Sequence, residues 1–181
     1  MLPPGHIAAG YLTAKIVTGS LQYNLTASQI NELSLIGAIV AFLPDLDFFF
    51  AFAKLKAFRI DNKIVNHRKL LTHAPIIWLL VGLIIFFSAS SDFGKALGLV
   101  FWLSSWSHFI LDSGEGIMWL WPFTKRFFPF SPAYYQRKYE FKHKEHKSFW
   151  KYWFNLAVKD YCSFTGIIEI LIILTALIVF F

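Results

Sequence analysis

The sequence predicts an all-α membrane protein, a polytopic bundle of four to five membrane-embedded helices with a basic, aromatic-rich cytoplasmic segment. Of the 181 residues, 56% are hydrophobic and 15% are charged, whereas soluble domains carry roughly 25% charged residues. The apolar residues gather in runs that approach the roughly 20 residues needed to cross a bilayer. No run alternates polar and apolar residues as strands do. The composition excludes intrinsic disorder, and residues 1–181 are expected to form a single membrane-embedded domain.

Five helices are expected in order along the chain. The first, over residues 6–17, is short for a membrane span, so the sequence leaves open whether it crosses the bilayer. Thr26 and Gln29 have capping-box spacing and predict where the next helix starts. Within that helix, Pro44 removes a backbone donor and predicts a local break. The four longer apolar runs cover residues 30–53, 74–89, 93–111 and 166–181.

The distribution of positive charge predicts the orientation. The chain has 17 Lys and Arg against 11 Asp and Glu, a formal net charge of +6. Nearly all of the basic residues lie in the connections 54–69 and 125–159, which the positive-inside rule assigns to the cytoplasm. We therefore expect a multi-pass protein of a bacterial or archaeal cytoplasmic (inner) membrane. Its N-terminus is expected inside and, if all five helices cross, its C-terminus outside.

Residues 113–163 are the only predicted segment large enough to lie outside the membrane. This segment mixes lysines with tryptophan, phenylalanine and tyrosine, which suits an interfacial cap on anionic lipid headgroups. The same mixture fits single-stranded nucleic acid, but beside four apolar runs anionic membrane lipids are the expected partner and no nucleic acid is expected. The single cysteine, Cys162, excludes an intramolecular disulfide and a cysteine metal site. Nothing in the sequence predicts the oligomeric state.

Acidic and histidine residues interrupt the apolar runs where little charge is expected. A carboxylate inside a membrane span costs about 2.5–3.5 kcal/mol on insertion scales, so such residues are rarely accidental. On the predicted topology, seven potential metal ligands from four separate segments converge on the cytoplasmic face. They are His6, Asp45, Asp47, His67, His73, His108 and Asp112.

The spacing of these residues refines the prediction. His108 and Asp112 are four apart on a helix, so they project from one face and can hold one cation. Asp45 and Asp47 are two apart, and the break at Pro44 lets both carboxylates reach one site or lets one of them orient a ligating histidine. A structural ion pair of Asp45 with Arg68 is the plain alternative.

Other polar residues give weaker indications. Thr72 is expected to cap the helix that carries Pro75 in its first turn. His143 and His146 lie in a charged run and are expected on the surface. Glu169, in the last helix, is either a helix partner or part of a cavity wall.

Imidazole and carboxylate ligands without thiolate suit Zn²⁺ best, with Mn²⁺ or Fe²⁺ as alternatives. Seven ligands exceed the needs of one tetrahedral zinc, so two or more ions are expected. Such ions lower the pKa of water, and the resulting hydroxide attacks phosphorus. In this scheme Asp45 or Asp47 bridges the ions, Arg68 neutralises a phosphate, and Glu115 is a candidate proton carrier whose plain alternative is a turn residue.

Several of these residues stand in motifs. Leu43-Pro44-Asp45-Leu46-Asp47, His67-Arg68 followed by Thr72-His73, and Ser107-His108 with Leu111-Asp112 resemble the YdjM-like, LexA-regulated inner-membrane family of metal-dependent hydrolases. His6 before Ala8-Ala9-Gly10 also fits, as does Gly116 followed by Trp121-Pro122-Phe123. The resemblance covers residues 5–125, and Ala74 is a mild departure from the small residue, such as Ser, that usually follows the second histidine.

The family looks distantly similar to zinc-dependent phospholipase C and the single-strand nucleases. That resemblance implies that the seven residues named above are metal ligands. The expected function is a membrane-bound metal-dependent hydrolase that cleaves phosphoester bonds of a phospholipid or other lipid phosphate at the cytoplasmic membrane face. The rivals are a metal transporter or sensor and a non-catalytic membrane scaffold with a structural metal.

Overall fold

The computed structural model describes residues 2–47, 68, 70–126, 128, 154–155, 157–158 and 161–181, with only the backbone described at residue 115. Five long helices make up most of this part of the chain, and within it we find no strand apart from one isolated bridge between Ile117 and Phe128. The predicted all-α fold is confirmed. The helices are α1 (Pro3–Ser20), α2 (Ala27–Phe42), α4 (Pro75–Ser88), α5 (Asp92–Asp112) and α8 (Phe164–Phe180).

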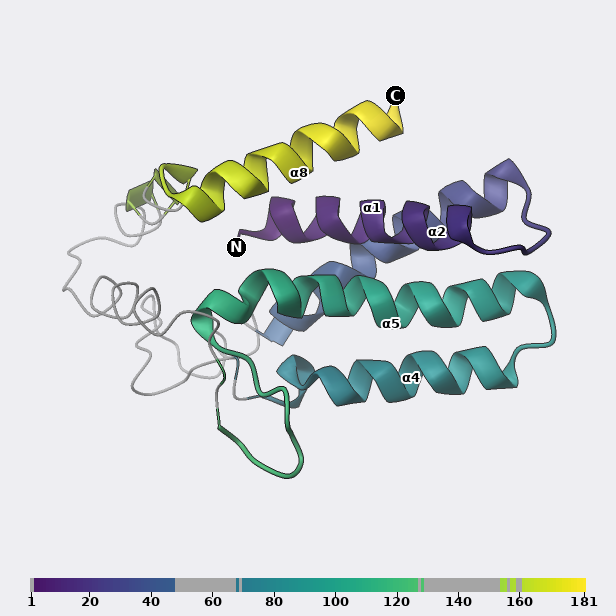
Figure 1. Cartoon of the computed structure of the whole chain (residues 1–181), viewed down its shortest axis with the longest axis horizontal. Coiled ribbons are helices and arrows are strands. Elements are labelled where there is room, and N and C mark those ends of the chain that lie inside the picture. Colours follow the sequence, from purple (N-terminus) through teal and green to yellow (C-terminus); the bar gives the residue numbers. More distant parts are fainter. Residues whose placement is uncertain are drawn as a thin grey trace.

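Helices α1, α2 and α5 contact one another and form the centre of the bundle, α4 packs beside α5, and α8 packs on α1 (Figure 1). Glycines let neighbouring helices approach closely, between α1 and α2 and between α4 and α5. A Cβ atom at Gly10 would lie 2.3 Å from the carbonyl oxygen of Gly37, and one at Gly82 would lie 2.7 Å from that of Gly98. Such close contact between small residues is the usual way in which helices associate in membranes.

The second helix shows both predicted local features. Thr26 and Gln29 form a capping box at its start. At its end the α-helix gives way to the 3-10 helix η1 (Leu43–Asp45), with Pro44 in its first turn. The break predicted from Pro44 is confirmed, and it turns the chain directly before the two aspartates.

The start of α4 differs from the prediction. Its N-cap is Ala74, with no side-chain cap, and Pro75 is its first residue. The assignment of Thr72 as the cap is wrong, because Thr72 lies in the preceding 3-10 helix η3 (Leu71–His73) and its hydroxyl donates a hydrogen bond to Asp47. Pro75 at the first helical position has no N–H, so one of the unpaired donors of a helix start is absent here.

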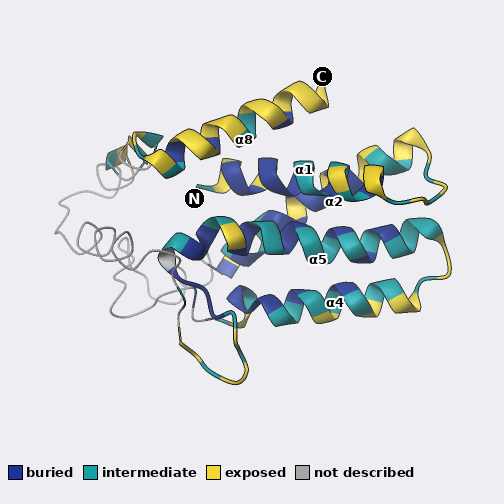
Figure 2. Cartoon of the chain, in the orientation of Figure 1, coloured by how far each residue is buried: buried dark blue, intermediate teal, exposed yellow. Residues whose placement is uncertain are grey.

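One helical stretch in the described residues, Ala27–Asp45 with 19 residues, is long and apolar enough to cross a membrane. Helices α4 and α8 are apolar but shorter, with 14 and 17 residues. The four to five crossings therefore remain a prediction. Figure 2 shows that α8 is exposed along most of its length, and its exposed side chains include Phe164, Leu171, Leu174 and Ile178. An apolar face of this kind is typical of contact with lipid or a partner.

Candidate metal centre

Helices α1 and α4 begin, and α2 and α5 end, at the same end of the bundle (Figure 1). The described polar residues predicted as metal ligands lie in the segments at this end. His6 comes from α1, Asp45 from η1, and His73 from η3. His108 and Asp112 come from the last turns of α5. Four separate segments therefore meet at this end, as the sequence predicts.

Four of these residues lie close enough to share one ion. One donor atom from each of Asp45, His73, His108 and Asp112 lies within 4.8 Å of the others. The two histidines are fully buried and Asp112 is 1% exposed, whereas the Asp45 side chain is 17% exposed. Asp45 thus forms the side of the cluster that is open to the outside.

The orientation of His108 fits a metal ligand. Its Nδ1 lies 2.8 Å from the carbonyl oxygen of Ala41, which can only accept a hydrogen bond, so Nδ1 carries the proton. In the neutral ring Nε2 then presents its lone pair. This atom is buried, has no hydrogen-bond partner among the described residues, and lies 3.7 Å from Oδ1 of Asp45. A lone pair and a carboxylate oxygen repel each other unless a cation lies between them.

His73 is oriented by Asp47. Its Nδ1 lies 2.9 Å from Oδ2 of Asp47, which also accepts the hydroxyl hydrogen of Thr72. Its Nε2 lies 3.7 Å from Oδ1 of Asp45. A carboxylate behind a histidine is the usual arrangement around a protein-bound metal, because it fixes the tautomer of the ring. Of the two roles that the sequence left open for Asp47, this geometry favours the orienting one.

The two carboxylates also act on the protonation of His73. Burial disfavours the charged ring, but the hydrogen bonds to Asp45 and Asp47 outweigh burial and raise the pKa of His73 above its ordinary value. In the metal-free protein the two carboxylates therefore favour the protonated, positively charged form of His73.

Arg68 pairs with Asp112. Its Nε lies 3.0 Å from Oδ2 of Asp112, and its Nη2 donates to the same oxygen. Both side chains are buried. The structural ion pair expected for Arg68 thus involves Asp112, whereas the sequence offered Asp45, because the side chain of Asp112 turns inward from the last residue of α5. Arg68 neutralises one oxygen of Asp112, and the other faces the cluster.

His6 completes the cluster from α1. Its ring stacks on that of His108, with 3.9 Å between the centroids and 28° between the planes. Its Nε2 lies 3.3 Å from Oδ1 of Asp112 and 4.0 Å from Oδ2 of Asp45. Neither ring nitrogen forms a hydrogen bond within the described part of the chain, although the ring is fully buried. Such an imidazole is available as a fifth ligand.

Some predicted residues lie outside this description. His67, His143 and His146 are outside the described residues. Glu115 ends the 3-10 helix η4 (Ser113–Glu115), and its side chain is likewise not described. Their predicted roles stay predictions.

The family comparison bears on the whole chain. The profile of the YdjM inner membrane protein family matches residues 1–180. The chain belongs to the YdjM family. No curated protein and no solved structure matches it, so the expected likeness to zinc-dependent phospholipase C finds no support there. By its family, the chain is an inner membrane protein. The description of the YdjM family names no activity.

Three supporting groups at this YdjM centre are not predicted from the sequence. The carbonyl oxygen of Ala41 accepts the hydrogen bond that orients His108. Because it is a backbone group, no residue type in the sequence indicates it. The Thr72 hydroxyl supports Asp47, and the Trp78 indole donates to the Thr72 carbonyl at 2.7 Å. The sequence shows that Thr72 stands directly before His73. It does not show that the Thr72 hydroxyl donates to Asp47, because that contact depends on how η1 and η3 pack together.

Proposed function

We propose that this YdjM-family protein is a membrane-bound, metal-dependent hydrolase that cleaves phosphoester bonds of a phospholipid or other lipid phosphate at the cytoplasmic membrane face. The observation that carries the proposal is the cluster of Asp45, His73, His108 and Asp112, whose donors lie within 4.8 Å of one another and of which all but Asp45 are buried. Oriented histidines and paired carboxylates in an apolar protein are costly to bury, and a divalent cation would offset that cost.

The donor set indicates which ion the centre would hold. Two imidazoles and two carboxylates without thiolate suit Zn²⁺, which takes four ligands in structural sites and three plus a water in catalytic ones. Mn²⁺ and Fe²⁺ accept the same donors. A second ion would need further ligands, and His6 and Asp47 are the described residues nearest to that role.

The residues around the cluster suit a phosphate ester. A bound divalent ion supplies a Lewis acid and activates water for attack on phosphorus. Asp45 is the partly exposed donor, so the substrate would approach on its side. Arg68 holds Asp112 in place, and its positive charge would also favour an anionic substrate.

The position of the centre supports a lipid substrate. The residues lie at one end of a bundle with exposed apolar helices, so a headgroup at the membrane surface could reach them while its acyl chains stay in the bilayer. Lys125 and Arg126, which follow the segment after η4, are exposed cations. Such residues attract anionic headgroups to the membrane face.

The second candidate is a structural metal that staples the helices together. The burial of His73, His108 and Asp112 favours it, because a closed site with every ligand from protein would need no access. The exposure of Asp45 favours the enzyme. A transporter is less well supported, because the cluster lies at one end of the helices and transport sites lie near their middle.

The proposal is tested with protein purified in mild detergent, loaded with Zn²⁺ or Mn²⁺, and offered a panel of lipid phosphates and phosphodiesters. We expect hydrolysis of at least one substrate, with a loss of 100-fold or more in the variants Asp45→Ala and His108→Ala. Asp92→Asn is the matched control, because this carboxylate lies at the opposite end of α5 and contacts Asn24. Metal bound without turnover of any substrate would favour the structural role instead.

A further inference from the structure

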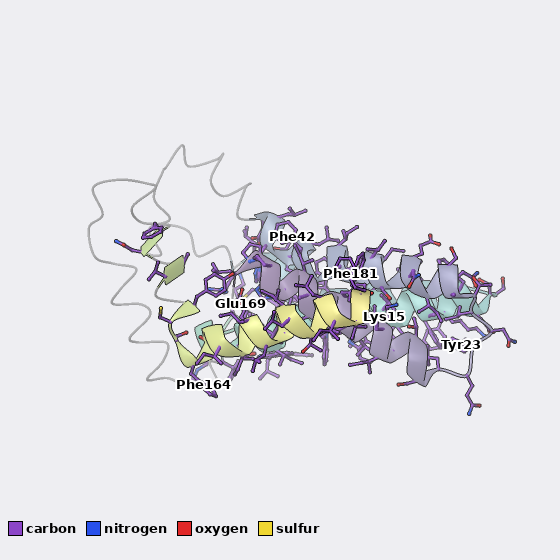
Figure 3. The ribbon with its side chains drawn as sticks, turned by 90° about the horizontal axis from the view of Figure 1, so that it is seen from above. Lys15, Tyr23, Phe42, Phe164, Glu169 and Phe181 are labelled. Carbon is purple, nitrogen blue, oxygen red and sulfur yellow. The ribbon has the colours of Figure 1, made fainter. Side chains whose placement is uncertain are left out.

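A fourth carboxylate is buried outside the cluster. Glu169 of α8 is 1% exposed, and Figure 3 labels it near the Phe164 end of that helix. Its Oε2 accepts a hydrogen bond from the backbone N–H of Leu2 at 3.2 Å, and its Oε1 lies 3.4 Å from the hydroxyl of Tyr161. The side chain therefore reaches from the last helix to the beginning of the first. Buried acidic residues in membrane proteins usually serve a function.

Gly5 makes room for this carboxylate. A Cβ atom at Gly5 would lie 2.6 Å from Cγ and 2.8 Å from Cδ of Glu169, closer than van der Waals contact allows. The missing side chain lets Glu169 lie directly against the backbone of the first turn of α1. The next residue is His6.

The first turn of α1 lacks the usual means of fixing a helix start. Its N-cap is Leu2, which makes no side-chain cap, and no acidic residue stands in the first turn. The first N–H groups of a helix have no partners within the helix, and a carboxylate near them is favourable because of the helix dipole. Glu169 provides from α8 the acceptor that the sequence of α1 does not contain.

His6 depends on this turn for its position. It is the fourth residue of α1, and neither of its ring nitrogens forms a hydrogen bond among the described residues. Its ring stacks on that of His108, and its Nε2 approaches Asp112 at 3.3 Å and Asp45 at 4.0 Å. If the first turn frays, little else keeps the imidazole in the cluster.

We propose that Glu169 is a positioning residue of the metal centre. By holding the first turn of α1 against α8, it fixes His6 beside Asp112 and His108, so that His6 serves as a ligand. The inference rests on the proposed metal centre and deepens it, because it makes α8 part of the site although α8 supplies no ligand. Without Glu169 the four donors Asp45, His73, His108 and Asp112 would remain and would bind the ion more weakly.

The test is a double-mutant cycle on Zn²⁺ affinity, measured in detergent by competition with a chelating dye. Groups that orient a metal ligand typically change affinity about 10–100-fold, so we expect Glu169→Ala to weaken binding about 10-fold. His6→Ala should weaken it at least as much. The double variant should bind no more weakly than His6→Ala alone, because Glu169 acts through His6. Glu169→Gln should stay near wild type, because the amide oxygen still accepts the Leu2 N–H.

Two further variants separate positioning from general stability. Gly5→Ala pushes Glu169 aside from the α1 side while raising helix propensity, so it should weaken Zn²⁺ binding even if Glu169→Ala does not fold. Ile173→Ala trims the same α1–α8 contact away from His6, and it should lower thermal stability while leaving the affinity unchanged.

The outcomes distinguish this inference from the proposal beneath it. Wild-type protein that binds no divalent metal would overturn both. A wild-type metal site that His6→Ala does not weaken, or effects of Glu169→Ala and His6→Ala that simply add, would overturn the positioning role and leave the metal centre standing. Loss of affinity in Ile173→Ala equal to that in Gly5→Ala would also overturn it.

Discussion

Asp47 stands directly behind His73, with Oδ2 of the carboxylate 2.9 Å from Nδ1 of the ring. The relationship joins η3 to the two residues that follow η1, and it turns the Nε2 of His73 toward Asp45. It also explains why two aspartates stand two residues apart after Pro44, since one faces the cluster and the other orients a ligand.

This geometry makes a prediction for Asp47→Ala. Removing the carboxylate frees the His73 ring, so Zn²⁺ affinity should fall about 10–100-fold with the number of bound ions unchanged. The affinity is measured by chelator competition and the stoichiometry by elemental analysis. A variant that loses one ion of two would show that Asp47 is itself a ligand. Thr72→Val, which removes the donor to Asp47, should have a smaller effect in the same direction.

Arg68→Ala should destabilise the metal-free protein. The change removes the guanidinium that pairs with the buried carboxylate of Asp112. Removing one partner of a buried ion pair lowers the free energy of unfolding by about 3–5 kcal/mol. Saturating Zn²⁺ should recover part of the loss, because the ion replaces the missing positive charge. Thermal unfolding in detergent with and without metal measures both effects. Equal unfolding temperatures for the variant and the wild type would contradict the pairing with Asp112.

Gly37→Ala tests the close packing of the central helices. A Cβ atom there would lie 2.6 Å from Cβ of Ala14 and 2.7 Å from the Gly10 carbonyl oxygen. Overpacking of this kind costs about 1–3 kcal/mol, so the unfolding temperature should fall. Gly19→Ala is the control, since nothing lies within 4 Å of its added methyl group, and it should be neutral or slightly stabilising. Equal unfolding temperatures for Gly37→Ala and Gly19→Ala would contradict the close packing at Gly37.

Acidification should release the metal. Metal binding requires His73 to give up its proton, and the pKa of this residue is raised in the metal-free protein by Asp45 and Asp47. Zn²⁺ affinity should therefore fall as the pH drops, and the fall should begin above the ordinary histidine pKa of about 6.5. In the metal-free protein the raised pKa stabilises the fold at acidic pH, and that contribution is lost as the pH rises through the folded-state value. An affinity independent of pH would contradict this.

The elements with local causes were predictable from the sequence. The capping box of Thr26 and Gln29 and the break at Pro44 depend on a few neighbouring residues, and the helices follow from apolar runs. The meeting of His6, Asp45, His73, His108 and Asp112 at one end of the bundle also followed, because helices of similar length that alternate in direction bring such ends together.

What escaped prediction depends on tertiary contacts. The partner of Arg68 is Asp112, a choice set by how α5 ends against the residues before η3. The Ala41 carbonyl that orients His108 is a backbone group released at the end of α2. For Glu169, the partner that the sequence could not show is the backbone N–H of Leu2, 167 residues earlier.

The metal content of the purified protein decides whether the cluster of Asp45, His73, His108 and Asp112 is a metal centre. Chains extracted from membranes in mild detergent and freed of loosely bound ions should retain at least one divalent ion, most readily Zn²⁺, and His108→Ala should retain far less. Asp92→Asn, at the other end of α5, should match the wild type. Wild-type protein without stoichiometric metal after exposure to Zn²⁺, Mn²⁺ and Fe²⁺, or metal retained equally by His108→Ala, would contradict the account.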